Sequence, residues 1–386
     1  MTVFTYLDRL IRQQNSPPAT LTIAEDHLLD GYEEGVERFL RPQESYFEIR
    51  LKQMYLRNQR EYWREFRPFS TFVTAFVHSG QKREMPFVIG PQQLGEQAAA
   101  LGGDAVEYRN LRVAGPFPYE GDDLQLFSAL SRLTANDWAV QSLSLLETVA
   151  KAFDVSKITR YLEIAAPLVK GIESFLGMQD VELRMGMQQV YQQPVGRGGL
   201  QPSALMARHE ALLNLPDHRL DSAARQQFWV KDGELFFGSR AETAQPYREA
   251  DFLLFEIRPL SDRGDFTTFD FHTVNWQDTQ KAIWDGSEEL ARQKLRLTAA
   301  ALAQCTDIVR PQRNALLRKY KTLFDEDLAL YQTMFAESTH RGADELRLKG
   351  VERAAALTEE VALKPLPIAP DERNLTPEQV MADLGL

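Results

Sequence analysis

The sequence contains a single cysteine, and this scarcity excludes several kinds of site. Cys305 is the only thiol among 386 residues. An intramolecular disulfide and a zinc or iron–sulfur site built from several cysteines are therefore excluded. Long apolar runs are missing as well. Because a membrane-spanning helix needs about 18 or more consecutive apolar residues, we expect none in this chain.

The N-terminal stretch does not resemble a secretion signal. MTVFTYLDRLIRQQ carries an acid at Asp8 and has no apolar core followed by a cleavage site. With a lone cysteine and no apolar span, these features favour a cytoplasmic protein.

Net positive charge is lacking too. The formal charge is -11, and the sequence pI is about 5.2. Such a balance argues against attraction of the whole surface to nucleic acid or anionic lipid. Hydrophobic residues make up 44% and charged residues 26%, which is typical of a folded protein. We therefore expect the partners to be proteins.

The first half of the chain has the alternation of β-strands. After a helical segment at 1–44, the run SYFEIRLKQMYL places apolar residues such as Phe47, Ile49 and Leu51 at every second position. Similar runs separated by Gly, Pro and Ser continue to about residue 135. Short strands at this spacing predict an antiparallel β-sandwich-like domain over 45–135.

The middle of the chain predicts a change of structure. Apolar residues recur with helical spacing over 136–178, which predicts a helical hairpin. Strand patterns return in 179–338, for which we predict an α+β domain with C-terminal helices. In FWVKDGELFFG (228–238) the Asp-Gly pair predicts a tight hairpin turn, and we expect this hairpin to edge or extend the second sheet. The run 251–259 is apolar at both parities, which indicates a central strand buried on both faces.

The helical pattern after Pro311 is the strongest in the chain. Leu317, Tyr320, Phe324 and Leu328 recur every three or four residues. This stripe predicts a core face packed on the second sheet or on neighbouring helices, with a groove for a partner as the alternative.

The tail, 339–386, predicts a helix, a proline-rich linker and a short terminal helix. In LTPEQVMADLGL, Thr376 fits the helix cap and Gln379 the reciprocal cap. So short a helix is unstable alone, so it docks either on its own chain or on a partner. For the second case, the predicted partner-binding side chains are Leu375, Val380, Met381 and Leu384.

No motif identifies a reaction. A hydrolase would use His272 as a base, with Asp270 nearby to orient the ring. A thiol enzyme would need Cys305, but we expect that residue on a buried helical stripe, where a thiol is inert. We therefore consider the protein more a binding protein than an enzyme, with the His272 hydrolase kept as an alternative.

Metal and cofactor signals are weak. The histidines are scattered, and no pair has the spacing of a helical zinc site. They are His27, His78, His209, His218, His272 and His340. The loop at 196–199 is rich in glycine but lacks the lysine and serine or threonine of a phosphate loop. We expect no metal and no cofactor.

A second alternative is single-stranded nucleic-acid binding. Between residues 46 and 69, aromatic residues that stack bases alternate with arginines that neutralise phosphates. The residues predicted to carry this activity are Arg57, Arg60, Trp63 and Arg64. Three glutamates in the same stretch offset half of its six positive charges.

Four runs resemble accessory proteins of bacterial defence operons: GPFPYEGDDLQLFSAL, VELRMGMQQVY, FWVKDGELFFG and ADFLLFEI. The resemblance spans roughly residues 100 to 335, and no run in it has a known chemical role. It implies an adaptor or scaffold that works with an enzyme encoded nearby in an antiviral defence system. The leading prediction is thus a non-enzymatic protein-binding adaptor of α+β fold.

Overall fold

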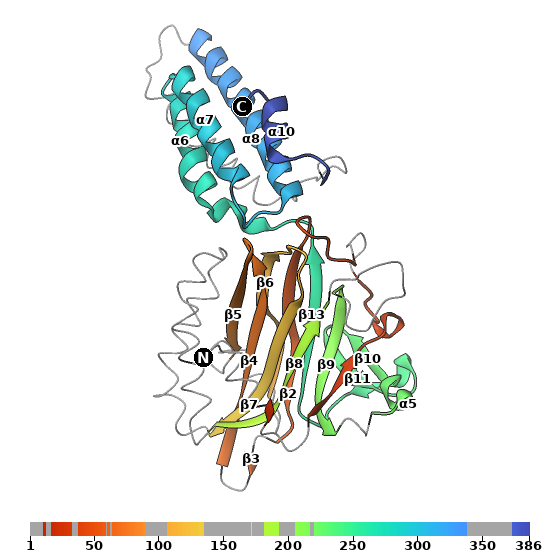
Figure 1. The fold of residues 1–386 in the computed structure, drawn as a ribbon. Helices are drawn as coiled ribbons and strands as arrows, with labels where there is room; N and C mark the ends of the chain where they lie inside the picture. The colour runs from red at the N-terminus through yellow and green to blue at the C-terminus, as the bar shows by residue number, and fades with distance from the viewer. Residues whose placement is uncertain are drawn as a thin grey trace. The chain divides into compact units, whose positions relative to one another are not determined.

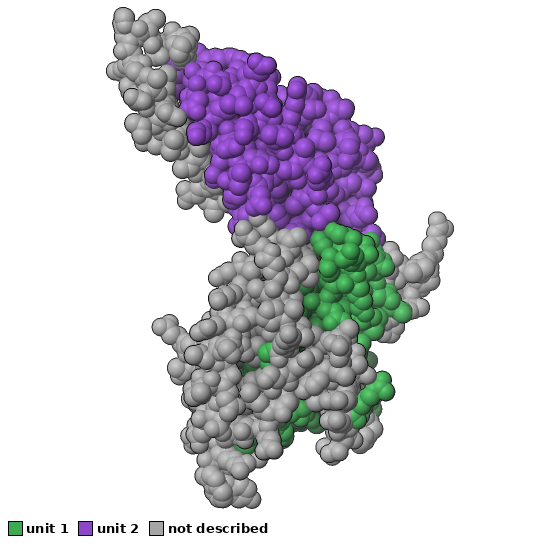
Figure 2. Space-filling model, turned by 60° about the vertical axis from the view of Figure 1, so that its left-hand side comes forward, with its two compact units in different colours: residues 1–41, 47–260 green, residues 42–46, 261–386 purple. Residues whose placement is uncertain are grey.

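The computed structural model describes most of the chain and divides it into two compact units. It describes residues 11–12, 17–32, 38–58, 60–61, 64–89, 106–134, 171, 181–192, 205–216, 220–337 and 373–386. Unit 1 consists of residues 1–41 and 47–260, and unit 2 of residues 42–46 and 261–386 (Figure 2). Both helices and strands are abundant, so the α+β class is confirmed.

Unit 1 contains a first five-stranded sheet with its members drawn from both halves of the unit (Figure 1). Its order is β1 (Pro18–Thr22), β9 (Arg208–Pro216), β13 (Phe252–Leu260), β2 (Tyr46–Leu56) and β6 (Val106–Pro118). β13 lies at the centre and is buried on both faces, as its doubly apolar pattern predicted.

The second five-stranded sheet is built around one long strand. It contains β3 (Arg60–Glu61), β4 (Arg64–His78), β5 (Gln81–Ile89), β7 (Leu124–Thr134) and β8 (Val181–Tyr191). β4 pairs antiparallel with β5 along one edge and with β7 along the other, and β8 follows β7.

The two sheets share one core and form a β-sandwich. Phe47 and Phe255 from the first sheet lie in the same buried cluster as Phe72 and Phe127 from the second. The strands of the two predicted domains are thus interleaved, and 252–260 pairs into the sheet that contains 46–56. The sequence predicted two separate sheet-containing domains, whereas their strands share one core. Periodicity shows which residues face a core, but it does not show which distant strands pair with one another.

The hairpin at 228–238 forms where its sequence predicts. β10 (Phe228–Lys231) and β11 (Glu234–Phe237) flank Asp232 and Gly233, whose φ angles are 51° and 73°. Its predicted place at the edge of a large sheet is wrong. With β12 (Gln245–Pro246) it forms a separate three-stranded sheet, because Phe228, Val230 and Leu235 bury their side chains in a core with Phe252 and Leu254.

The described part of unit 1 also contains short helical elements between its strands. These are the 3₁₀ helices η1 (Glu25–His27) and η5 (Ala241–Thr243) and the single-turn helix α5 (Ser222–Arg225). η1 leads into a segment that lies along β10, since Leu28 and Val230 form a parallel bridge.

The described part of unit 2 is helical. Its elements are η6 (Gly264–Thr268), the π-helix η7 (Phe271–Trp276), α6 (Gln277–Trp284), α7 (Glu288–Ala303), α8 (Arg310–Glu337) and α10 (Pro377–Asp383). The stripe that includes Leu317, Tyr320 and Phe324 faces a core made by these helices. The predicted core face is therefore confirmed, with neighbouring helices as its cover.

The terminal helix α10 docks on its own chain. Thr376 and Gln379 form the reciprocal capping box that the sequence predicts, and Pro377 occupies the first turn. Val380 is fully buried in the helical core, and α10 contacts both α7 and α8.

Several predicted segments lie outside the described residues. They are the first ten residues of the helical segment predicted at 1–44, the helical hairpin at 136–178 apart from residue 171, the loop at 196–199, and the helix and linker between 338 and 372. Within the described part of 1–44 the helical prediction is wrong at Pro18–Thr22, because these residues pair with β9 as strand β1. Among the described helices, none is both long and apolar enough to cross a membrane.

Candidate functional site

Three strands of the first sheet place a row of polar side chains on one face. Glu256 on β13 lies opposite His209 on β9 in the strand register. On the other side of β13, β2 carries Lys52, whose Nζ lies 3.3 Å from Glu256 Oε2. Adjacent strands bring such side chains close together, so the three residues form a cluster although they are far apart in the sequence.

This cluster borders a pocket of about 240 Å³ within unit 1. Besides Lys52, His209 and Glu256, its lining includes Tyr32, Asp30 and Arg258. The pocket therefore combines a sheet surface with the 28–32 segment and with the hairpin turn, which contributes Gly233. Concave sites with a few converging polar groups are the usual places where proteins bind ligands.

His209 is neutral in this environment. Its side chain lines the pocket, yet the residue is only 7% exposed. Burial lowers the pKa of the His209 imidazole from 6.5 to about 4, against a smaller opposing effect of Glu256. Within the described part of the chain, neither of its ring nitrogens has a hydrogen-bond partner, and Nδ1 is buried. A buried polar ring without a partner is uncommon and often marks a functional site.

Tyr32 closes another side of the pocket. Its hydroxyl donates a hydrogen bond to the Ala207 carbonyl at 3.2 Å, and its ring centroid lies 6.0 Å from that of His209. Burial, helped by the negative charge of Glu256, raises the pKa of Tyr32 to about 12. The hydroxyl therefore stays protonated and committed to the backbone, so Tyr32 serves to position the wall and offers its ring to a ligand.

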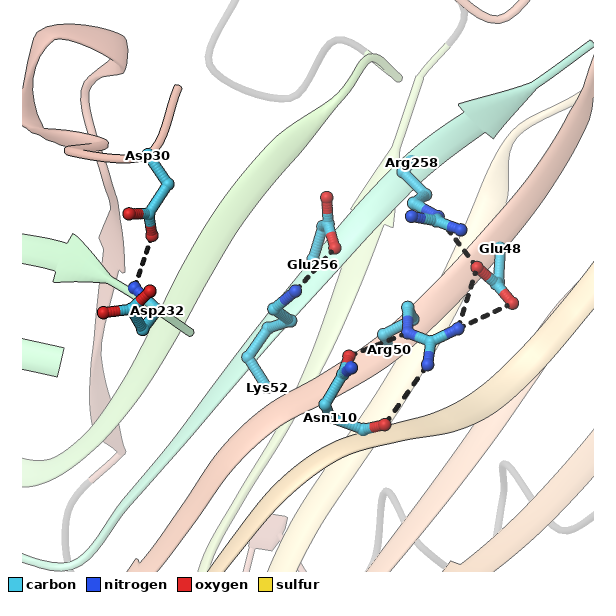
Figure 3. A network of polar contacts seen from close by, with 8 residues as sticks. All are labelled: Asp30, Glu48, Arg50, Lys52, Asn110, Asp232, Glu256 and Arg258. Carbon is cyan, nitrogen blue, oxygen red and sulfur yellow. Dashed lines mark hydrogen bonds and ion pairs between the residues drawn. The ribbon is translucent and has the colours of Figure 1, made fainter. Parts of the chain in front are cut away.

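Arg258, which lines the pocket, and the neighbouring Arg50 are both engaged with Glu48. Arg258 Nε donates to Glu48 Oε2 at 2.8 Å, and Arg50 Nη1 lies 3.3 Å from Glu48 Oε1 (Figure 3). Arg50 also donates to the side chain and the carbonyl of Asn110. This network fixes both guanidinium groups at one end of the polar row.

The other end of the pocket is held by the turn of the hairpin. The Asp30 carboxylate accepts a hydrogen bond from the backbone N–H of Asp232 (Figure 3). One residue earlier, the Leu29 N–H donates to the Val230 carbonyl at 2.9 Å. Backbone contacts to β10 and its turn thus determine where Asp30 lies.

The predicted His272 site has a different environment from the expected one. His272 is buried in η7, and its Nδ1 lies 2.8 Å from the hydroxyl of Tyr320. Tyr320, and not the exposed Asp270, is therefore the hydrogen-bond partner of this nitrogen. Burial lowers the pKa of His272 to about 4. The ring is 2% exposed and belongs to the helical core, where a substrate has no access.

Cys305 lies beyond the end of α7, and not on the helical stripe predicted for it. It is half-buried against the helical core, and burial raises the pKa of its thiol. Such a thiol is a poor nucleophile.

The residues predicted for nucleic-acid binding are only partly described. Arg57 directly follows β2, and there its backbone N–H donates to Asp251 and its guanidinium donates to the Glu249 carbonyl. Arg60 and Arg64 belong to the short β3–β4 pairing, and Trp63 lies outside the described residues.

The residues predicted to bind a partner are packed within unit 2. Val380 is buried, while Leu375, Met381 and Leu384 are partly buried against the same helical core. In this docked arrangement their apolar surfaces contribute to the helical core.

Two residues of the pocket left a signal in the sequence. Glu256 interrupts the apolar run 252–257, and a charged residue there indicates a polar function or a buried ion pair. His209 and Glu210 similarly interrupt a strand. The described residues contain no group of three or more His, Cys, Asp or Glu side chains arranged to hold a metal ion.

No family model, curated protein or solved structure matches this chain.

Proposed function

We propose that the protein is a non-enzymatic protein-binding adaptor or scaffold, and that it contacts its partner at the polar pocket of unit 1. The observation that carries this proposal is the exposure of two large apolar side chains, one within a segment that lines the pocket and one on the neighbouring segment 38–40. Leu29 and Phe39 are each 41% exposed. Apolar side chains beside a polar pocket are a combination typical of protein interfaces.

Both residues are tied to the pocket by backbone contacts. Leu29 lies between the lining residues Leu28 and Asp30. Phe39 bridges to Met206, and the N–H of the lining residue Ala207 donates to the Arg38 carbonyl at 2.7 Å. Such anchoring favours binding because little conformational freedom is lost when a partner docks.

The test is affinity purification of the tagged full chain from cells that express it naturally. We expect one protein to co-purify in stoichiometric amount and to be lost with the double variant Leu29→Ser and Phe39→Ser. Val190→Ser is the matched control, because Val190 is 39% exposed and lies on β8 of the second sheet. Equal recovery of the co-purified protein with the wild type, the double variant and Val190→Ser would refute the proposed surface.

The resemblance to accessory proteins of bacterial defence operons extends this proposal. It implies that the partner is encoded near this chain and that both act in the cytoplasm. Mass spectrometry of the co-purified protein tests this extension, since a partner encoded far from the chain would argue against it.

A further inference from the structure

The pocket lining contains two carboxylates and two basic groups. The carboxylates of Asp30 and Glu256 face a single ammonium group, that of Lys52. The guanidinium groups of Arg50 and Arg258 are engaged by Glu48 at the end of the polar row (Figure 3). These two acids and two bases balance in charge, and because the Arg258 guanidinium donates to Glu48, Lys52 is the lining base that pairs with Glu256.

Both carboxylates have an oxygen available. Glu256 Oε2 accepts from Lys52, and Asp30 Oδ2 accepts from the Asp232 N–H, while the second oxygen of each has no hydrogen-bond partner in the described part of the chain. The Lys52–Glu256 contact of 3.3 Å is longer than the usual ~2.7–2.9 Å of a charge-assisted hydrogen bond. The pair therefore leaves capacity for a further donor.

His209 supplies an independent indication of a ligand. This buried, neutral ring lines the pocket and makes no hydrogen bond with the described residues. Its interactions with Glu256, Lys52 and Asp30 show that these groups lie close to it. A neutral imidazole has one nitrogen that can accept a hydrogen bond.

We infer that the pocket binds the ammonium group of a lysine side chain on the partner protein, an inference that rests on the proposed function. An ammonium group carries three N–H donors, and Asp30, Glu256 and His209 offer three acceptors around one small cavity. The Tyr32 ring in the wall already has the Arg38 guanidinium 5.8 Å from its centroid, so the two carboxylates and the His209 ring are the groups that hold the ammonium. The net charge of -11 favours the approach of a basic partner from a distance.

The experiment is an NMR titration of the full-length protein labelled with ¹³C at histidine. The probe is Nα-acetyl-lysine methylamide, and its neutral counterpart is Nα-acetyl-norleucine methylamide. The His209 signal is assigned with His209→Gln. We expect a saturable shift of this signal with the lysine probe, and none with the norleucine probe.

Variants of opposite effect make the test specific. Glu256→Gln and Asp30→Asn should each weaken binding of the lysine probe by roughly tenfold, because each removes a charged acceptor. Lys52→Met should strengthen binding, since it removes the competing ammonium. Asp232→Asn is the matched control: it removes a neighbouring negative charge, keeps the backbone N–H that contacts Asp30, and should change the affinity by less than about twofold.

Three results would overturn the inference: an equal shift with norleucine, no saturable shift with lysine, or unchanged affinity in Glu256→Gln. These results are separable from failure of the proposed function. A co-purified protein that is lost with Phe39→Ser but retained by Glu256→Gln leaves the adaptor function standing. Lysine binding without any co-purified protein supports the pocket and argues against the adaptor.

Discussion

Lys52 and Glu256 form an ion pair between residues 204 positions apart in the sequence, with 3.3 Å between Nζ and Oε2. Lys52 lies on β2 and Glu256 on β13, which are neighbours in the first sheet. This pair joins the first and last thirds of unit 1 at the floor of the pocket.

Loss of Lys52 should destabilise unit 1. Lys52→Met leaves the largely buried Glu256 carboxylate without its cation, and we expect the free energy of unfolding to fall by about 1–2 kcal/mol. Adding Glu256→Gln should restore part of the loss, and urea denaturation measures both. Lys231→Met, at an exposed position of β10, is the control and should change little. Equal stabilities of Lys52→Met and wild type would contradict the account of the pair.

The helical unit should lose stability on mild acidification. The pKa of His272 is about 4 in the folded protein and 6.5 as the ordinary value. Between these pH values the unfolded chain binds a proton that the folded protein does not, so stability falls as the pH drops through this window. The effect is on the order of 3 kcal/mol near pH 4. The free energy of unfolding, measured with urea at neutral pH and near pH 4, should differ less between these two pH values in His272→Gln than in the wild type. An equal difference in both proteins would contradict the assignment.

Val380 should be a core residue. Val380→Ala removes two methyl groups from the buried contact of α10 with the helical unit, and we expect a loss of about 1–3 kcal/mol. Asp383→Ala, on an exposed position of the same helix, is the matched control. Thermal unfolding distinguishes the two. A neutral Val380→Ala would indicate that α10 leaves the core and is available to a partner.

Two glycines should differ in their tolerance of alanine. Gly80 and Gly115 have φ angles of 67° and 90°, so alanine at either position carries a backbone cost of about 1 kcal/mol. Only Gly115 also approaches other backbone atoms, because a Cβ there would overlap Phe47 O and Glu48 Cα, whereas the space at Gly80 is open. We expect Gly115→Ala to cost at least about 2 kcal/mol more than Gly80→Ala in urea denaturation. Similar losses at both positions would contradict the close packing of β6 on β2.

Local patterns in the sequence predicted much of the fold. The hairpin turn at Asp232 and Gly233 and the capping box of Thr376 and Gln379 both form where their side chains and backbone angles favour them. The burial of β13 on both faces also follows from its composition, because a strand that is covered on both faces carries mostly apolar residues at odd and even positions alike. These features depend on residues within a few positions of one another.

Strand pairing and the pocket could not be predicted in the same way. Lys52, His209 and Glu256 lie on three strands that pair only in the folded sheet, so the polar interruptions at His209 and Glu256 do not show that these strands bring them together. The sequence also predicted the wrong orienting partner for His272. Asp270 was expected, but the hydroxyl of Tyr320, on another helix, contacts the ring. Contacts between distant segments depend on tertiary packing, which periodicity does not encode.

The most direct test of the account is photo-crosslinking in cells that express the protein naturally. A benzoylphenylalanine at position 39 places the reactive group on the exposed segment that bridges to Met206, next to the lining residue Ala207, and the same substitution at position 190 is the control on β8. The account predicts a crosslink to one protein from position 39 that disappears with Glu256→Gln, and no such product from position 190. The same crosslinks from both positions, or none from position 39, would contradict the claim that the pocket of unit 1 binds a protein partner.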